Sequence, residues 1–509
     1  MDLPPVAPIS RFPVEVLTRI LMVLNDDLFY EDHSPFETPD LPLLSVTQVC
    51  AEWRKILLNY PVFWTKIMLG GVSQKRLLEH MATHARGLPL DVKVYVDPYY
   101  DLYSTRTTNI DHVWGRAAKI RSLCIRASLP DMTYSCLGRH GTVIGAPLLE
   151  RLTLETNRDA NFPANTVDKV LYQIKAPRLR EFASFNHPLP QCSLFPSTLQ
   201  ELHFVGEVAK SSHLLQYLPQ FSELKRLTLR SVFADALPSA AQPIHLPGLM
   251  ELKLHTNIEP LLYLLTNTKV HPHCKFDLCL DFCRPRGSLL GDLATAIGEK
   301  ARCVLRGHPS EDPALDLELW KAGKVIFRLL AGSVNASPPH LQISIHDSRN
   351  DLTLTQNAGV FLILLQHIPA VAILKIRVFG SFDCCLTPIF VAAPMQTVTD
   401  LTLYDPQPYI WTEICTFKHT LPSFLPLQSL QVLRIAGKTN TMSRIKGSKL
   451  TGLTGIKQLL SSVRYRASTS FPLKVIDICG LDSQDPLHAA LSEAAPTLEQ
   501  LGVELQCGP

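Results

Sequence analysis

A six-residue pattern, L-x-x-L-x-L, recurs along most of the chain and constrains its fold more than any other feature. Clear copies, some with Val, Ile or Phe in place of Leu, begin at Leu149, Leu199, Leu224, Leu249, Val398, Leu430, Leu473 and Leu498. Weaker copies begin at Ile120, Leu179 and Val371, and a proline usually stands shortly before a copy. The alternating apolar residues that end each copy predict a short strand with one buried face.

The spacing of the copies predicts how these strands are arranged. The copies at Leu149, Leu179, Leu199, Leu224 and Leu249 begin at intervals of 30, 20, 25 and 25 residues. Intervals of about 20–29 residues are typical of leucine-rich repeats, in which one unit cannot bury its leucines alone but stacked units can. We therefore predict an α/β solenoid with a curved parallel sheet. The alternative is an ordinary α/β domain with leucine-rich parallel strands.

Charge and regularity divide the chain further. Residues 1–70 hold five Lys and Arg against nine Asp and Glu, whereas the remainder holds 44 against 37, so the two parts differ in the sign of their net charge. This supports a domain boundary near residue 70 and a repeat domain over residues 71–507. Residues 259–369 lack clean repeats, although strands are predicted at 275–282 and 341–346, so we expect an irregular segment there.

The N-terminal 70 residues follow a different pattern. Residues 9–21 read I-S-R-F-P-V-E-V-L-T-R-I-L, and Leu17, Ile20, Leu21 and Leu24 have the spacing of one helix face. A second stripe, typical of another helix, consists of Val46, Val49, Cys50, Trp53 and Leu57. The sequence P-V-F-W over residues 61–64 predicts a third, anchoring turn. Two such short helices are too small to bury their own apolar faces, so we expect them to need a partner.

The opening I-S-x-F-P-x-E-V-L-x-x-I-L, the centre V-C-x-x-W-x-x-I and the end P-x-x-W occur here in the order found in the F-box, and residues 9–70 resemble that family. The resemblance implies a three-helix domain that binds a Skp-type adaptor, which is itself bound to a cullin. It also implies adaptor contacts, which we expect from Phe12, Pro13, Val16, Leu17, Ile20, Val49, Cys50 and Trp53. The later repeats resemble the divergent leucine-rich-repeat-like domain that follows the F-box in fungal proteins, which makes the expected fold α+β overall.

This segment departs from a compact F-box in one place. Residues 25–40 contain six acidic residues and no Lys or Arg, which predicts a solvated loop. The proline-rich residues 1–8 predict a disordered arm. The alternative for residues 9–69 is that they form the first helices of a larger all-helical core.

On a sheet of stacked repeats, the residues between the leucines face outward. Their mixed charges and aromatic rings suit a protein-binding surface, although any solvated sheet face is also polar. The candidates for target binding are Arg151, Glu155, Arg226, Arg230, Lys253, His255 and Tyr404.

The sequence offers little support for catalysis. Gly437-Lys438-Thr439 ends like a phosphate-binding loop, but Val432 stands where its first glycine is required. The best candidate metal ligands are His271, His273, Cys274, Cys279 and Cys283, yet their spacing lacks a C-x-x-C pair and the strict alternation through residues 276–282 indicates a strand. We expect no catalytic residues, no metal and no cofactor.

The composition narrows the partners and the compartment. A net charge of +3 over 509 residues gives no electrostatic case for nucleic acid. The start lacks the pattern of a secretory signal, and no apolar run approaches the roughly 20 residues that span a bilayer. The 13 cysteines are scattered and odd in number, which is typical of free thiols in a reducing compartment. We therefore expect a cytoplasmic or nuclear protein that does not bind membranes.

The resemblance to the F-box implies a non-enzymatic substrate receptor of a Skp–cullin–F-box ubiquitin ligase. The F-box would bind the adaptor, and the repeat domain would hold a target protein for ubiquitination. A scaffold that binds the adaptor but delivers nothing to a ligase is an alternative, and a metal-dependent enzyme built on residues 259–369 is a less favoured one.

Overall fold

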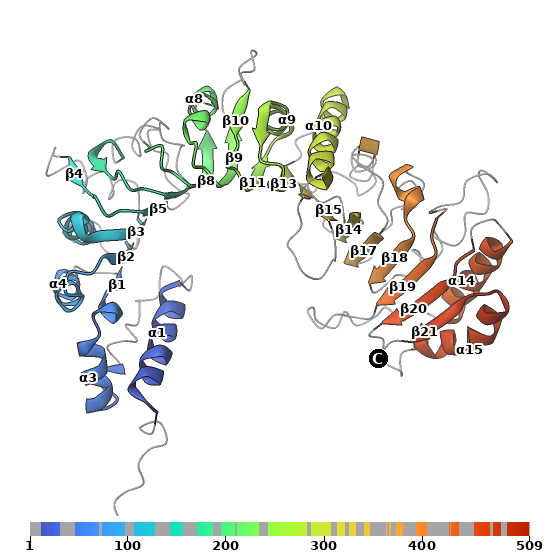
Figure 1. Cartoon of the computed structure of the whole chain (residues 1–509), viewed down its shortest axis with the longest axis horizontal. Coiled ribbons are helices and arrows are strands. Elements are labelled where there is room, and N and C mark those ends of the chain that lie inside the picture. Colours follow the sequence, from blue (N-terminus) through green and yellow to red (C-terminus); the bar gives the residue numbers. More distant parts are fainter. Residues whose placement is uncertain are drawn as a thin grey trace, which may run out of the picture. The chain divides into compact units, whose positions relative to one another are not determined.

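The computed structural model describes residues 12–30, 46–70, 74–96, 106–127, 143–155, 171–186, 195–208, 211–233, 243–281, 287–306, 313–320, 325–331, 341–346, 363, 366–367, 373–379, 393–404, 427, 429–436, 452–468, 472–479 and 486–507. The chain divides into two compact units, Met1–Pro238 (unit 1) and Ser239–Pro509 (unit 2). Each combines helices with a large, mostly parallel sheet, as predicted (Figure 1). The predicted N-terminal arm, residues 1–8, lies outside the described residues.

All strands of the main sheet in unit 1 run parallel. Their spatial order follows the chain. They are β1 (Lys66–Gly70), β2 (Leu90–Tyr95), β3 (Ile120–Arg126), β5 (Arg151–Glu155), β7 (Glu181–Phe185), β8 (Glu201–Val208) and β9 (Arg226–Phe233). Because β1 begins at Lys66, the sheet starts before the boundary predicted near residue 70.

Unit 2 contains one interruption of the parallel order. Its strands are β11 (Glu251–Thr256), β13 (Lys275–Asp281), β14 (Pro313–Trp320), β15 (Val325–Ala331), β16 (Leu341–His346), β17 (Ile373–Phe379), β18 (Asp400–Tyr404), β19 (Val432–Ala436), β20 (Val475–Cys479) and β21 (Glu504–Cys507). In space, β13 is followed by β16, β15, β14 and then β17, and β15 is antiparallel to both of its neighbours. This reversed hairpin lies within residues 259–369.

The first leucine of the pattern closes a turn. The amide of Leu149 donates to the Ala146 carbonyl at 3.1 Å, and the amide of Leu179 donates to the Ala176 carbonyl at 3.1 Å. A proline follows each of these alanines, at the position where its fixed φ favours a β-turn. The residue after the leucine then bonds to the preceding strand, as where the Glu150 amide donates to the Arg121 carbonyl at 2.8 Å. A proline at the second position of the turn thus helps to start the strands β5 and β7.

A short second strand precedes some of these turns. Two additional parallel pairs are formed, by β4 (Ile144–Gly145) with β6 (Ile174–Lys175) and by β10 (Ile244–Leu246) with β12 (Thr268–Val270). Each of these four strands begins seven residues before a strand of the main sheet, at Arg151, Glu181, Glu251 and Lys275 respectively. The same turn-and-strand unit therefore recurs in both units of the chain.

The last two leucine positions of the pattern point into the core. In β5, Leu152 and Leu154 are buried while the residues between them are half-buried, and the same alternation occurs in β11 and β19. The copy at Leu498 is an exception, and the strand predicted there is wrong. Leu498 belongs to helix α15 (Pro486–Gln500), and the strand β21 begins only at Glu504.

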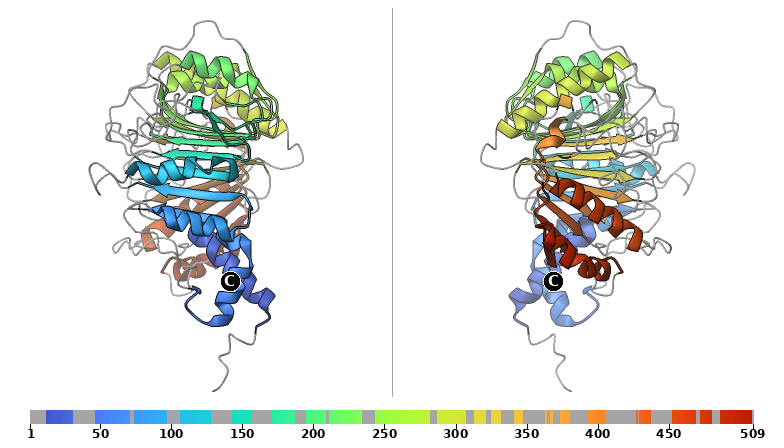
Figure 2. Two further views of the ribbon diagram at one scale, coloured as in Figure 1. Left: turned by 90° about the vertical axis from the view of Figure 1, so that its left-hand side faces the viewer. Right: turned by 90° about the vertical axis from the view of Figure 1, so that its right-hand side faces the viewer.

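Helices connect many of the strands. In Figures 1 and 2, the helices that connect one strand to the next lie along one side of the sheet within each unit. They include α4 (Lys75–His84), α5 (Arg106–Trp114), α8 (Ser211–Tyr217), α9 (Ile258–Asn267), α10 (Gly287–Arg306), α14 (Gly452–Ala467) and α15. The other side of each sheet carries the polar residues between the leucines, and we call it the polar face.

Gly298 in α10 allows a close approach between two segments. A Cβ atom added at Gly298 would lie 2.7 Å from the Cβ of His367 and would also meet its carbonyl oxygen. We expect Gly298→Ala to destabilise unit 2 by about 1–2 kcal/mol, because overpacking exceeds the gain of about 1 kcal/mol in helix propensity. Gly291, in the same helix, has nothing within 4 Å of such a Cβ, so Gly291→Ala should instead stabilise it. Denaturant unfolding of both variants checks the opposite signs.

Candidate functional site

Helix α1 (Val14–Tyr30) exposes a continuous apolar stripe. Val16, Ile20, Val23 and Leu24 stand at i, i+4, i+7 and i+8, and they are 40%, 44%, 51% and 47% exposed. Phe12, just before the helix, is also exposed. Isolated apolar residues are common on protein surfaces, but a contiguous helical stripe of this kind is typical of interaction sites.

An adjacent face of α1 is buried within the chain. Leu17 and Leu21 are each only 2% exposed. The prediction that Leu17 belongs to the adaptor-facing edge is therefore wrong, because this side chain is already covered by unit 1. The single stripe read from the sequence separates into an inner pair, Leu17 and Leu21, and an outer pair, Ile20 and Leu24.

Contacts with the sheet fix the C-terminal end of α1. Phe29 is buried against Met68 of β1 and Tyr95 of β2. The ammonium groups of Lys66 and Lys93 lie 5.7 and 4.9 Å from the centre of the Phe29 ring, within the range of cation–π attraction.

The prediction of an acidic loop is wrong at its N-terminal end, because helix α1 extends into that segment. The loop was expected over residues 25–40, but residues 25–30 are helical and the Asp26 carboxylate pairs with Lys66. Residues 31–40 lie outside the described residues. Tertiary contacts to the sheet thus extend a helix that the local charge pattern would have ended.

The second predicted helix is shorter than expected. Helix α3 spans Ala51–Asn59, and Cys50 is its N-cap, with its sulfur accepting a hydrogen bond from the Trp53 amide at 3.4 Å. Val49 and Cys50 are exposed, and Trp53 is half-buried. Pro13 is exposed directly before α1. Figures 1 and 2 show α1 and α3 side by side, so seven of the eight predicted adaptor contacts remain accessible on neighbouring elements.

The predicted anchoring turn is present as η2 (Pro61–Trp64). Trp64 is 1% exposed, and its indole N–H donates to the Leu57 carbonyl at 2.8 Å. Its ring lies 4.8 Å from the His84 ring and 5.6 Å from the His80 ring, both on α4. Burial, with the charges of His80 and Arg86, lowers the pKa of His84. Trp64 therefore joins α3 to the helix that follows the first strand.

The polar face of unit 1 holds four of the predicted target-binding residues. Arg151 and Glu155 lie on β5, and Arg226 and Arg230 lie on β9. Glu155 accepts hydrogen bonds from Arg126 at 2.8 and 2.7 Å, and Arg226 pairs with Glu201 of β8. No ion pair or hydrogen bond of the Arg151 or Arg230 side chain occurs within the described residues.

The remaining predicted target-binding residues lie in unit 2. Lys253 and His255 are on β11, where Lys253 pairs with Glu251 at 2.8 Å. Tyr404 ends β18, but its side chain is outside the described part. The predicted set is thus divided between the two units of the chain.

A row of cross-strand polar contacts, which the sequence did not predict, crosses the polar face of unit 2. Asp277, Gln342, Arg328 and Asp316 are in register on β13, β16, β15 and β14. Gln342 bonds to Asp277 at 3.2 Å and to Arg328 at 2.8 Å, and Arg328 lies 3.5 Å from Asp316. We call these four residues the polar ladder. Its members are dispersed over 65 residues of sequence, so only the strand order brings them together.

A second bridge on this face has one cation between two acids. Arg434 of β19 lies 2.6 Å from Asp400 of β18 and 3.2 Å from Asp477 of β20. Cross-strand pairs of this kind favour one strand register. Several charged side chains on the polar face of unit 2 are therefore already paired with other residues of the chain.

The predicted metal ligands do not form a site among the described residues. No group of three or more His, Cys, Asp or Glu side chains there could hold a metal ion. The His271 and His273 rings are 5.3 Å apart, but Cys274 is buried, and burial raises the pKa of its thiol to about 12. Cys279 lies on β13, the predicted strand, and Cys283 is outside the described residues.

No protein-family model matches the chain, and no curated protein is significantly similar to it in sequence. Among the described helices, none has the length and apolar character needed to cross a bilayer.

Proposed function

We propose that this protein is the target-recognition subunit of a Skp–cullin–F-box ubiquitin ligase, acting in the cytoplasm or the nucleus. The N-terminal helices bind a Skp-type adaptor, and the leucine-rich remainder binds the protein to be ubiquitinated. In this role the chain accelerates the reaction by holding the target near the transferring enzyme and needs no catalytic residue of its own.

The exposed stripe of α1 carries the proposal. Val16, Ile20, Val23 and Leu24 face outward, while Leu17, Leu21 and Phe29 fix the helix to the rest of unit 1. A helix that is apolar on both faces requires a second covering surface, and an adaptor protein supplies one.

The resemblance to the F-box supports the identity of that partner. Its three sub-motifs fall on consecutive structural elements, namely the start of α1, the segment through Cys50 into α3, and η2. The recurring turn-and-strand unit supports a leucine-rich-repeat-like solenoid for the rest. In such a solenoid, the polar face left open by the helices is available to a target.

Polar substitutions in the stripe test adaptor binding. We expect Val16→Asp/Ile20→Asp to abolish capture of a Skp-type adaptor, because two carboxylates would be buried unpaired at the interface. Val16 and Ile20 replace Leu17 as test positions, since polar substitution of buried Leu17 would also unfold the helix. The measurement is a quantitative pull-down with purified adaptor.

Val143→Asp serves as the control, because Val143 is equally apolar and 50% exposed but lies far along the chain. It should retain full adaptor binding. Unchanged binding by the stripe variant would contradict the proposal. Recovery of the adaptor from cells without a cullin would instead identify a scaffold that binds the adaptor outside a ligase.

A further inference from the structure

Two histidines on one side of helix α4 lie close enough together to share a metal ion. Residues 80–84 read H-M-A-T-H, so His80 and His84 stand at i and i+4, on adjacent turns of the helix. Their ring centres are 4.5 Å apart, and the ring planes are inclined by 65°. The same spacing places two zinc ligands on one helix face in H-E-x-x-H metalloproteases.

The separation of the two rings agrees with two bonds to one ion. A zinc–imidazole bond is about 2.1 Å long, which puts the centre of a ligating ring about 3.2 Å from the metal. Two such rings are then about 4.5 Å apart at a right angle between the bonds, and about 5.2 Å apart at a tetrahedral angle. The observed 4.5 Å lies within this range, so the pair needs little rearrangement to chelate an ion.

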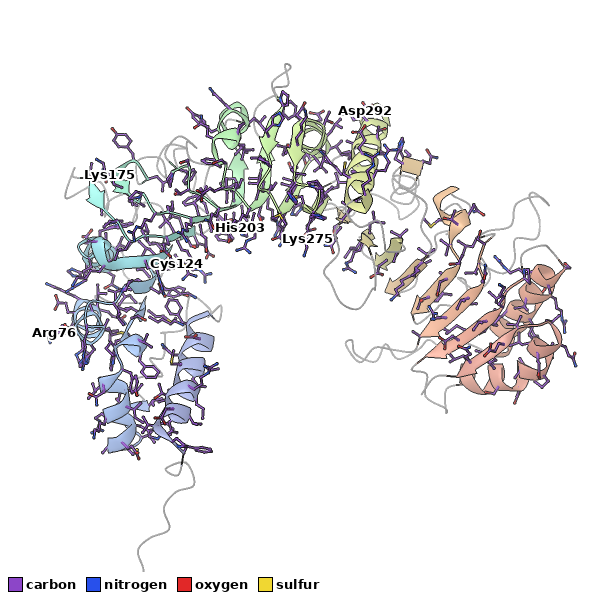
Figure 3. All side chains as sticks on the ribbon, viewed as in Figure 1. Arg76, Cys124, Lys175, His203, Lys275 and Asp292 are labelled. Atoms are coloured by element: carbon purple, nitrogen blue, oxygen red, sulfur yellow. The ribbon has the colours of Figure 1, made fainter. Side chains whose placement is uncertain are left out.

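The nitrogen atoms of both imidazoles are available to a ligand. Within the described residues, neither His80 nor His84 makes a hydrogen bond or an ion pair through its side chain. His80 is exposed and His84 is half-buried. Arg76, one turn before His80, lies on the outer side of α4, away from the sheet (Figure 3). A metal ion can therefore reach the pair from solvent.

Trp64 supports both rings from the inner side. Its ring centre lies 4.8 Å from that of His84, with the planes inclined by 33°, and 5.6 Å from that of His80, with the planes inclined by 87°. Trp64 is itself buried and bonded to the Leu57 carbonyl. Side chains that are already held in place lose little conformational freedom on binding, which favours chelation.

The charges around the pair have opposing effects on a bound cation. Burial, with the charges of His80 and Arg86, lowers the pKa of His84, which favours the neutral imidazole that a metal requires. Arg76 and Arg86 stand at either end of the pair, and their positive charges repel a metal ion. The neighbouring acid, Glu79, lies 3.9 Å from Lys75, so its charge is partly compensated.

We propose that His80 and His84 chelate Zn²⁺, with water molecules at the remaining coordination positions. Zinc prefers imidazole ligands and a coordination number of four. The bound ion joins two turns of α4 beside Trp64, and it thereby strengthens the connection between α3 and α4. We depart here from the sequence-based expectation of no metal, because the H-x-x-x-H spacing alone does not reveal that the two rings lie side by side on Trp64.

Hydrogen exchange of the α4 amides, with and without Zn²⁺, tests the proposal on the full chain. An ion that binds only the folded helix stabilises it by mass action, so free Zn²⁺ at about ten times the dissociation constant should slow exchange about elevenfold. The readout is local, which matters because the chain has 18 His and 13 Cys that could bind zinc elsewhere.

His80→Gln should remove this slowing, because one imidazole alone does not chelate. Since His80 is exposed, the variant should keep the exchange rates of the unaltered chain when Zn²⁺ is absent, which shows that it folds. Slowing by Zn²⁺ that persists in His80→Gln, or no slowing in the unaltered chain, would overturn the proposal. The two rings would then serve only to cover Trp64.

His245→Gln is the matched control, since His245 is an exposed histidine on β10, outside this helix. It should leave the effect of Zn²⁺ on α4 unchanged. Arg86→Asn should lower the Zn²⁺ concentration needed for half of the effect severalfold, because a repelling cation is removed. Asparagine also tolerates the positive φ of 49° at this position. An unchanged or raised concentration in Arg86→Asn would place the ion away from His84.

Discussion

Replacing Trp64 with alanine is expected to destabilise the N-terminal helical part of the chain by about 3–5 kcal/mol. The indole is 1% exposed, and it connects Leu57 at the end of α3 with His80 and His84 of α4. Its removal would leave a cavity and an unpaired Leu57 carbonyl at the same place. The measurement is hydrogen exchange of the α3 and α4 amides, which reports local stability in a chain of two units.

Trp53 provides a control of the same residue type in the same segment. It is half-buried on α3, so Trp53→Ala should cost clearly less local stability than Trp64→Ala. Trp53 is also a predicted adaptor contact, and its variant should weaken adaptor capture while the helices keep their protection. Equal loss of protection in both variants would show that Trp64 does not hold α3 to α4.

Replacing Arg328 with leucine is expected to destabilise unit 2 by about 3 kcal/mol, because it removes a cation that faces a buried carboxylate. Asp316 is 4% exposed and Arg328 lies 3.5 Å from it. The cost is placed at the lower end of the range for buried pairs, since the Arg328 side chain is 22% exposed and Lys375 lies opposite Asp316 on β17. Hydrogen exchange of the β14, β15 and β16 amides measures the change.

The double variant Arg328→Leu/Asp316→Leu separates two contributions to the loss of stability. One is the lost attraction between Arg328 and Asp316, and the other is the cost of burying the Asp316 carboxylate without Arg328. We expect it to be more stable than Arg328→Leu alone, because the buried carboxylate is removed together with the cation that faces it. A double variant less stable than either single variant would mean that the two side chains stabilise unit 2 independently. The ion pairs of Arg434 are less buried and offer a comparison, and Arg434→Leu should have a smaller effect.

The strands were predictable wherever the apolar spacing alone determines the backbone. In β5, β11 and β19 the second and third leucine positions are buried, as the pattern requires. The failure at Leu498 has a local cause. Leu491, Ala494 and Leu498 have helical spacing, and Gly502 at φ +73° ends α15, with the Val503 amide bonding to the Leu498 carbonyl at 3.0 Å. Gly502 is the feature of the sequence from which the end of this helix could have been predicted.

Other features depend on contacts between distant residues and could not be read from one stretch. Helix α1 continues past Asn25 because Asp26 and Phe29 meet β1 and β2. Likewise, only the docking of α1 decides that Leu17 is inside and Ile20 outside, since both lie on one apolar stripe in the sequence. The exposed Val23, which extends the candidate site, was missed for the same reason.

The reversed order of β14, β15 and β16 determines how unit 2 can assemble. A sheet whose neighbours follow the chain can grow one strand at a time, with short loops to close. In the reversed region, β16 is the strand that pairs with β13. The contact between Gln342 of β16 and Asp277 of β13 joins residues 65 apart in the sequence, so closing the loop between them costs more chain entropy. We expect the antiparallel trio, whose strands are consecutive, to form as its own nucleus and then to join β13 and β17. The speed with which unit 2 folds would then depend on this step rather than on the regular strands around it.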